Sequence, residues 1–99
     1  MREEHSVKRI VKLTFREEEC NRFMEIYKES EKKISQFTGC KSVELLRSKN
    51  LDNIFFTFSV WTGEEALENY RKSDLFKSTW SRVKPLFGGK PEAWTLEVI

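Results

Sequence analysis

Apolar and polar residues alternate along four short segments of the chain, and a two-residue period of this kind predicts β-strands. The expected strands are residues 7–14, 41–47, 54–61 and 93–99. The third (IFFTFSVW) is the strongest, because aromatic and β-branched side chains suit a pleated, buried surface. The first places Arg9 on the same face as three apolar residues, namely Val7, Val11 and Leu13.

A longer apolar period, of three to four residues, predicts a helix over residues 17–36. Glutamates at positions 17–19 suit the start of this helix, because they offset its partial positive charge. Gly39 comes after the last apolar position and predicts a left-handed cap. The apolar side of the helix carries Cys20, Phe23, Met24, Tyr27 and Ile34.

A second helical stretch follows the strongest strand and is interrupted near its middle. Thr62 and Glu65 have the spacing of a capping box, in which each side chain binds a backbone N–H at the helix start. Ser73 is expected to cap a restart, and Pro85 marks the end, because proline does not continue a helix. The inner faces of the two pieces carry Ala66, Leu67 and Tyr70, then Phe76, Trp80 and Val83.

The predicted element order is β-α-β-β-α-β. Short hairpin loops make neighbouring strands antiparallel, and helices on one face of such a sheet give a ferredoxin-like α+β sandwich. A chain of 99 residues is too short for two ordinary cores, so we expect a single domain over residues 1–99. Residues 1–6 are expected to form a flexible tail.

The two faces of residues 54–61 differ. One face is wholly apolar, with Ile54, Phe56, Phe58 and Val60. Helices cover only one side of a ferredoxin-like sheet, so we expect a second copy to stack sheet on sheet as a homodimer. The other face reads large, small, small, large, which leaves room for a cavity above its middle: Phe55, Thr57, Ser59 and Trp61. Packing of the two small residues against a bulky helix side chain is the alternative explanation.

Composition narrows the possible functions. The 18 lysines and arginines nearly balance 16 acidic residues, which does not favour a nucleic-acid or membrane surface. No segment approaches the roughly 20 apolar residues of a membrane span, so a cytoplasmic location is expected. Cys20 and Cys40 lack metal spacing and are expected to be free thiols. His5 is the only histidine, which disfavours a zinc site or a catalytic triad.

Several segments together resemble the antibiotic biosynthesis monooxygenase (ABM) family of the dimeric α+β barrel superfamily. They are Phe37-Thr38-Gly39, Val60-Trp61, Glu65-Ala66-Leu67, Ser73-Asp74-Leu75-Phe76 and Trp80. The resemblance implies a homodimer of ferredoxin-like domains, with a pocket between sheet and helices in each subunit. Characterised members include cofactor-independent monooxygenases that oxidise phenolic polycyclic or quinol substrates with molecular oxygen, and others that degrade haem.

Residue by residue, the resemblance carries over in part. Trp61 matches the pocket tryptophan of the polyketide-oxidising members, but their Asn and Tyr are replaced here by Thr57 and Leu67. The haem degraders use an Asn on the first strand, a Trp in the second helix and a later His. This chain has no Asn on that strand, and Tyr70 and Trp80 occupy the other two positions. Haem degradation is therefore disfavoured.

These observations favour a cofactor-independent monooxygenase acting on a phenolic or quinol-type aromatic small molecule. Its substrate-binding residues are expected to be Trp61, Tyr70, Trp80, Phe76, Tyr27 and Thr57. Arg71 or Arg82 could stabilise a phenolate, no residue stands out as a general base, and no metal or other cofactor is expected.

Two alternatives have different chemistry. A non-catalytic dimer of the same fold would use the cavity to bind or sense an apolar small molecule. An RNA-recognition domain shares the element order, and Phe56 and Phe58 mimic its paired aromatics. However, Asn53-Ile54 stands where that motif has a basic residue and Gly, and the charge is balanced, so RNA binding is disfavoured.

Overall fold

The computed structural model describes residues 6–99, which form one antiparallel sheet of four strands. The strands lie in the order β2-β3-β1-β4, as a ferredoxin-like fold requires. They are β1 (Val7–Thr14), β2 (Cys40–Arg47), β3 (Ile54–Trp61) and β4 (Glu92–Glu97). The expectations for a flexible tail and for His5 lie outside the described residues, except at Ser6, whose hydroxyl accepts a hydrogen bond from Lys41.

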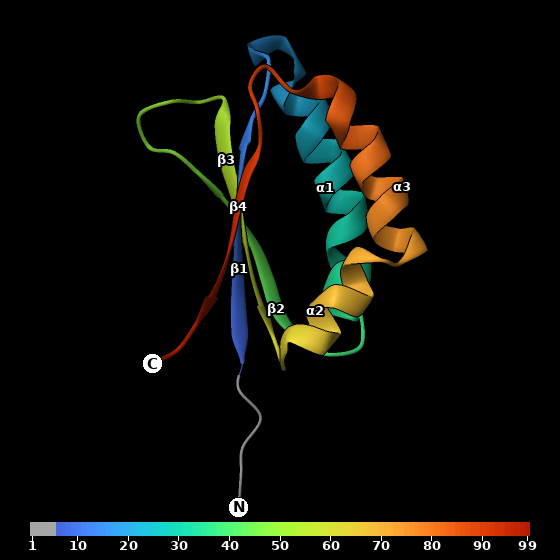
Figure 1. Cartoon of the computed structure of the whole chain (residues 1–99). Helices are drawn as coiled ribbons and strands as arrows, with labels where there is room; N and C mark the ends of the chain where they lie inside the picture. Colours follow the sequence, from blue (N-terminus) through green and yellow to red (C-terminus); the bar gives the residue numbers. More distant parts are fainter. Residues whose placement is uncertain (1–5) are drawn as a thin grey trace, which may run out of the picture.

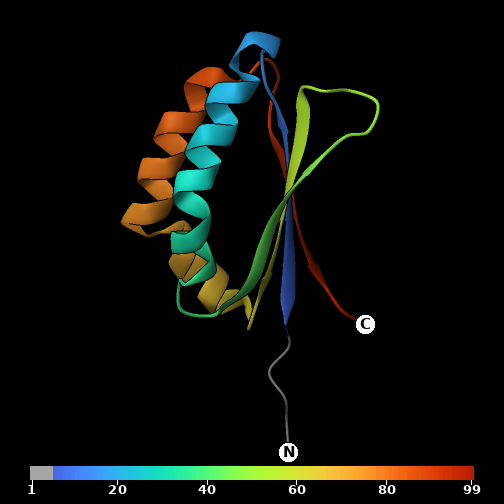
Figure 2. The ribbon, with the colours of Figure 1, turned by 180° about the vertical axis from the view of Figure 1, so that it is seen from behind.

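The helices form a second layer on one side of the sheet, and both views show the opposite side without a helix (Figures 1 and 2). The layer consists of α1 (Cys20–Ser35), α2 (Glu64–Arg71) and α3 (Asp74–Val83). Short 3-10 turns lie at Glu17–Glu19 and Lys84–Leu86. The α+β sandwich predicted from the sequence is therefore confirmed.

Predicted and observed boundaries differ most in two elements. The segment expected as one helix over 17–36 opens with a 3-10 turn and becomes α-helical at Cys20. Its start is fixed by long-range pairing, since the backbone N–H of Arg16 donates to Leu86. The last strand covers Glu92–Glu97 rather than 93–99, because its pairing with β1 ends where β1 begins, at Val7 opposite Glu97.

The capping box predicted at Thr62 and Glu65 is wrong. The N-cap of α2 is Gly63, and no side chain caps it. The backbone N–H of Thr62 donates instead to the carbonyl of Gly39 at 2.8 Å, which keeps Thr62 outside the helix. The cap at Ser73 is confirmed, because its hydroxyl accepts the N–H of Phe76 at 3.1 Å.

Gly39 joins α1 to β2 at a crowded point. Its φ of +89° lies in the left-handed region that glycine favours. A Cβ at this position would clash with the Cβ of Ala66 on α2. Both the turn and the close approach of α2 therefore need a residue without a side chain, which confirms the predicted left-handed cap.

The core lies between the sheet and the helices, and its larger cluster is at the end where β1 finishes. There Phe15 stacks on Phe23 with ring centroids 4.2 Å apart, and Phe55 meets both rings edge-on. These three side chains are at most 2% exposed. A smaller cluster around Trp61 and Leu67 lies between β3 and α2. Aromatic and aliphatic residues therefore fill both ends of the space between the sheet and the helices.

The other face of the sheet has an apolar centre, with charged residues such as Lys8, Lys12 and Glu44 around it, and is covered by no element of residues 6–99. Its register places Ile10 beside Phe58 on one side and Trp94 on the other. Leu46, Trp94 and Leu96 keep between 44% and 45% of their surface exposed. No helix in this part of the chain is long and apolar enough to cross a membrane, and the cytoplasmic location stays a prediction.

Candidate functional site

A cavity of about 380 Å³ lies between the sheet and the helices. All six predicted substrate-binding residues line it: Thr57 and Trp61 from β3, Tyr27 from α1, Tyr70 from α2, and Phe76 and Trp80 from α3. The structure thus brings together every residue that the sequence selected. Their role in binding stays a prediction.

The cavity exists because β3 carries small side chains at its middle. Thr57 and Ser59 face the helices, between the larger Phe55 and Trp61. The cross-strand neighbours of the two small residues on β1 are Val11 and Arg9. The packing alternative considered for the sequence does not hold, since helix side chains leave a hollow above these positions.

Aromatic rings form a continuous wall that runs from the end of β3 along α2 and α3. Trp61 stacks on Tyr70 with centroids 4.9 Å apart, and Tyr70 meets Phe76 edge-on at 5.3 Å. Phe76 lies parallel to Trp80 within 7°, at 6.0 Å. Such faces favour a flat, aromatic ligand through stacking and edge contacts.

The polar groups of the wall have distinct roles. The indole N–H of Trp61 donates to the hydroxyl of Ser59 at 2.9 Å, so this pair is satisfied internally. The hydroxyl of Tyr27 donates to Glu31 at 3.0 Å, which fixes its ring and occupies its proton. Tyr27 was predicted as a ligand contact, and it can now serve through its ring face.

Both tyrosines retain their protons at neutral pH. Burial raises the pKa of Tyr70 to about 12, and burial together with the bond to Glu31 raises the pKa of Tyr27 further. Tyr70 is therefore a hydrogen-bond donor rather than a base.

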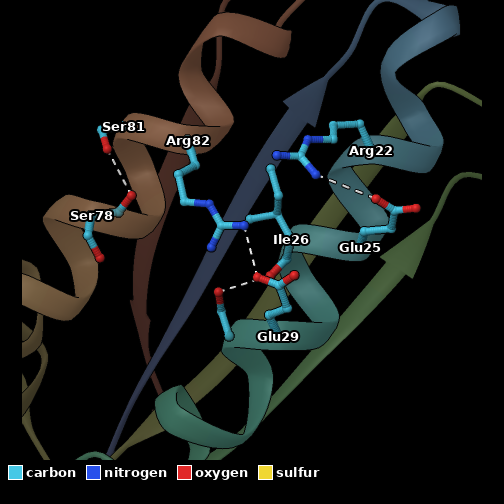
Figure 3. Close-up of polar contacts among 8 residues, drawn as sticks. Arg22, Glu25, Ile26, Glu29, Ser78, Ser81 and Arg82 are labelled. Carbon is cyan, nitrogen blue, oxygen red and sulfur yellow. Dashed lines mark hydrogen bonds and ion pairs between the residues drawn. The ribbon is translucent and has the colours of Figure 1, made fainter.

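The arginines divide between the cavity and the outer surface. Arg71 lines the cavity, whereas Arg82 lies on the exposed side of α3. Arg82 donates to Glu29 of α1 at 2.8 Å and holds the pKa of that carboxyl below its ordinary value (Figure 3). Of the two candidates for phenolate stabilisation, Arg82 is excluded by this position.

Some lining residues were not selected from the sequence. Arg9, Ser59 and Thr79 also face the cavity. The sequence did place Arg9 on the same strand face as Val7, Val11 and Leu13. A single charged residue among apolar ones does not indicate whether it lines a cavity. Among residues 6–99, no cluster of three or more His, Cys, Asp or Glu side chains could hold a metal ion.

Cys20 and Cys40 are free and half-buried, as expected. Burial is the main cause that raises the pKa of each thiol. Neither thiol lies on the wall of the cavity. They therefore contribute to packing, and the site consists of aromatic rings, hydroxyls and arginines.

The fold and the cavity define the class of domain: a ferredoxin-like α+β sandwich with an aromatic cavity between its two layers. The sequence model of the family described as antibiotic biosynthesis monooxygenase matches residues 6–81. The chain belongs to this family, which confirms the resemblance seen in the sequence. No curated protein matches the sequence significantly.

Solved structures agree on the fold. A candidate antibiotic biosynthesis monooxygenase from Caulobacter crescentus has a TM-score of 0.90 at 18% identity, covering 97% of this chain and 92% of its own. A candidate of the same description from Nitrosomonas europaea has a TM-score of 0.91 at 10% identity, covering 100% and 95%. A conserved protein from Methanosarcina mazei reaches 0.88 at 17% identity, covering 93% and 91%. At such identities the likeness establishes the fold.

Proposed function

We propose that the protein is a cofactor-independent monooxygenase that oxidises a phenolic or quinol-type aromatic molecule bound in the cavity. The observation that supports this most is the enclosed wall of Trp61, Tyr70, Phe76 and Trp80 in a chain of the ABM family. A volume of about 380 Å³ falls within the usual range for small-molecule sites.

In this reaction the substrate is its own reductant. An electron-rich anion passes an electron to molecular oxygen, one oxygen atom enters the substrate, and the other leaves as water with two substrate hydrogens. The chain would hold the ring flat between its aromatic faces and exclude water. Tyr70, protonated and half-buried, would donate a hydrogen bond to the developing oxyanion.

The functional unit in this proposal is a homodimer. The uncovered face of the sheet joins apolar residues of all four strands, including Phe56, Phe58 and Trp94. Monomeric proteins rarely leave an apolar patch of more than a few hundred Å² in water. A second copy stacked on this face would bury it, and would leave the helix layer and its cavity on the outside of each subunit.

Oxygen uptake with anthrone tests the activity. Anthrone and one O₂ give anthraquinone and one water, so we expect uptake above the protein-free rate with one quinone formed per O₂. With ¹⁸O₂, one labelled atom should appear in the quinone. Tight binding of anthrone without uptake would favour the non-catalytic binding protein instead, and absence of both would contradict each function.

A further inference from the structure

One end of the cavity is positively charged, although its walls are otherwise apolar. Arg9 lies on the helix side of β1, between its cross-strand neighbours Ser59 and Thr95. It is half-buried, and its Nη1 donates to the hydroxyl of Thr95 at 2.7 Å. This bond holds the guanidinium at the β4 edge of the cavity.

Arg71 reaches the same cavity from the last turn of α2. It also lines a groove that includes Thr95, the residue to which Arg9 donates, so both arginines lie toward the same edge of the site. Its partner is Glu68, at 3.5 Å, with both side chains about half exposed. A long, solvated ion pair of this kind is weak and leaves most donors of Arg71 available.

The two positive charges influence each other. Burial and the nearby charge of Arg71 lower the pKa of Arg9 from its ordinary value, with Glu68 opposing. Glu92 is the only carboxylate among the described wall residues, and its register opposite Lys12 places it on the uncovered face of the sheet. An anion in the cavity would offset this unbalanced positive charge.

The opposite end of the cavity carries no charge. Along β1, the residues facing the helices pass from Arg9 through Val11 to Leu13. Phe23 of α1 and Val83 of α3 close this apolar end. A ligand that fits both ends therefore has a flat apolar body and an anionic group at one end.

We propose that Arg9 and Arg71 form a carboxylate-binding subsite, so that the cavity takes an aromatic carboxylic acid in its ionised form. Guanidinium groups match a planar carboxylate with paired donors, which suits this ligand better than a single oxyanion. This proposal rests on the proposed function, because both place the ligand in the same cavity. It adds an anchoring group that is separate from the phenol or quinol that reacts.

The test compares the binding of 2-naphthoate with that of its neutral analogue 2-naphthamide. Calorimetry measures both affinities, and the measurement does not require oxygen. The wild-type protein should bind 2-naphthoate about tenfold or more tightly, as charge-assisted hydrogen bonds imply. Arg9→Gln and Arg71→Gln should each remove most of this preference, because naphthoate binding weakens much more than naphthamide binding. Arg82→Gln is the matched control, because it removes the same charge from outside the cavity.

Several outcomes would overturn the subsite. They are equal binding of the two probes by the wild type, an equal loss in Arg82→Gln, or no binding of naphthoate at millimolar concentration. If Arg9→Gln does not fold, as judged by circular dichroism, the exposed Arg71→Gln variant decides alone. Neither probe is oxidised by the proposed reaction. Failure of the subsite is therefore distinguishable from failure of the activity, which is read from anthrone oxidation.

Discussion

On the helix side of β3, Phe55 and Trp61 enclose the smaller Thr57 and Ser59, whereas the opposite side is apolar at every position of the strand. In the first row Phe55, Ser59 and Trp61 are buried and Thr57 is half-buried, and the row still leaves a hollow under the helices. The second row is continuous and has no cover within residues 6–99. The difference indicates that one face of the strand shapes a ligand site, while the other is suited to another sheet.

The largest effect should come from two neighbouring phenylalanines on opposite faces. Phe55→Ala removes a ring that is 1% exposed, and should lower the free energy of unfolding by about 3–5 kcal/mol. Phe56→Ala should lower the free energy of unfolding by less than half as much in dilute protein, where the monomer prevails. Its deficit should grow at high concentration, because the wild type then gains stability from association.

Urea unfolding at two protein concentrations measures both deficits. Each variant loses the same side chain, so each is the control for the other. Equal deficits in dilute protein would contradict the distinction between a covered and an uncovered face.

A charge on the uncovered face should break the proposed dimer. Val60→Arg would bury an unpaired guanidinium between two sheets, since its cross-strand neighbours are Lys8 and Ser42, and should weaken association by about 100-fold or more. Sedimentation velocity measures this change. Ser78→Arg adds the same charge on the exposed side of α3 and should leave the dimer intact. A wild type that stays monomeric at high concentration would remove the basis of this prediction.

A smaller effect is expected from filling the hollow. Thr57→Leu places a larger apolar side chain at the middle of the cavity, and should weaken naphthamide binding by about tenfold while the fold is retained. Calorimetry gives the affinity and thermal unfolding gives the stability. Ser78→Leu is the control outside the cavity. Unchanged affinity in Thr57→Leu would show that the probe binds elsewhere.

The smallest effect concerns the start of α3, the helix that carries Phe76 and Trp80 over the hollow. Ser73→Ala removes the acceptor of the Phe76 N–H and should cost about 1 kcal/mol. Glu65→Ala should change the free energy of unfolding by less than about 0.5 kcal/mol, because no side chain caps α2. Thermal unfolding compares the two variants. A larger loss of stability in Glu65→Ala would show that the capping box does form at the start of α2.

The fold was largely predictable because its signals are local. The alternation in β3 and the helical spacing from Phe23 to Ile34 can be read within a few residues. The capping box predicted at Thr62 failed for the opposite reason, because the backbone N–H of Thr62 donates to Gly39, which is distant in sequence. Long-range hydrogen bonds of this kind decide where a helix begins, and no local spacing reveals them.

The site was predictable in its aromatic part and less so in its charges. Phe76 and Trp80 lie one helical turn apart, so their common face follows from spacing. Arg82 is only two residues from Trp80, yet it points to Glu29 on another helix. The position of Arg9 near Arg71 likewise depends on how α2 packs against β3, the neighbour of β1, which the sequence does not display.

The three tryptophans of the chain occupy three different surroundings. Trp61 is fully buried with its N–H bonded to Ser59, Trp80 is half-buried on the cavity wall, and Trp94 is 44% exposed on the uncovered sheet face. Their fluorescence should therefore separate by emission wavelength and by access to aqueous quenchers. Variants that keep a single tryptophan would each report on one process by fluorescence: Trp61 on the integrity of the core, Trp80 on ligand entry and Trp94 on subunit association.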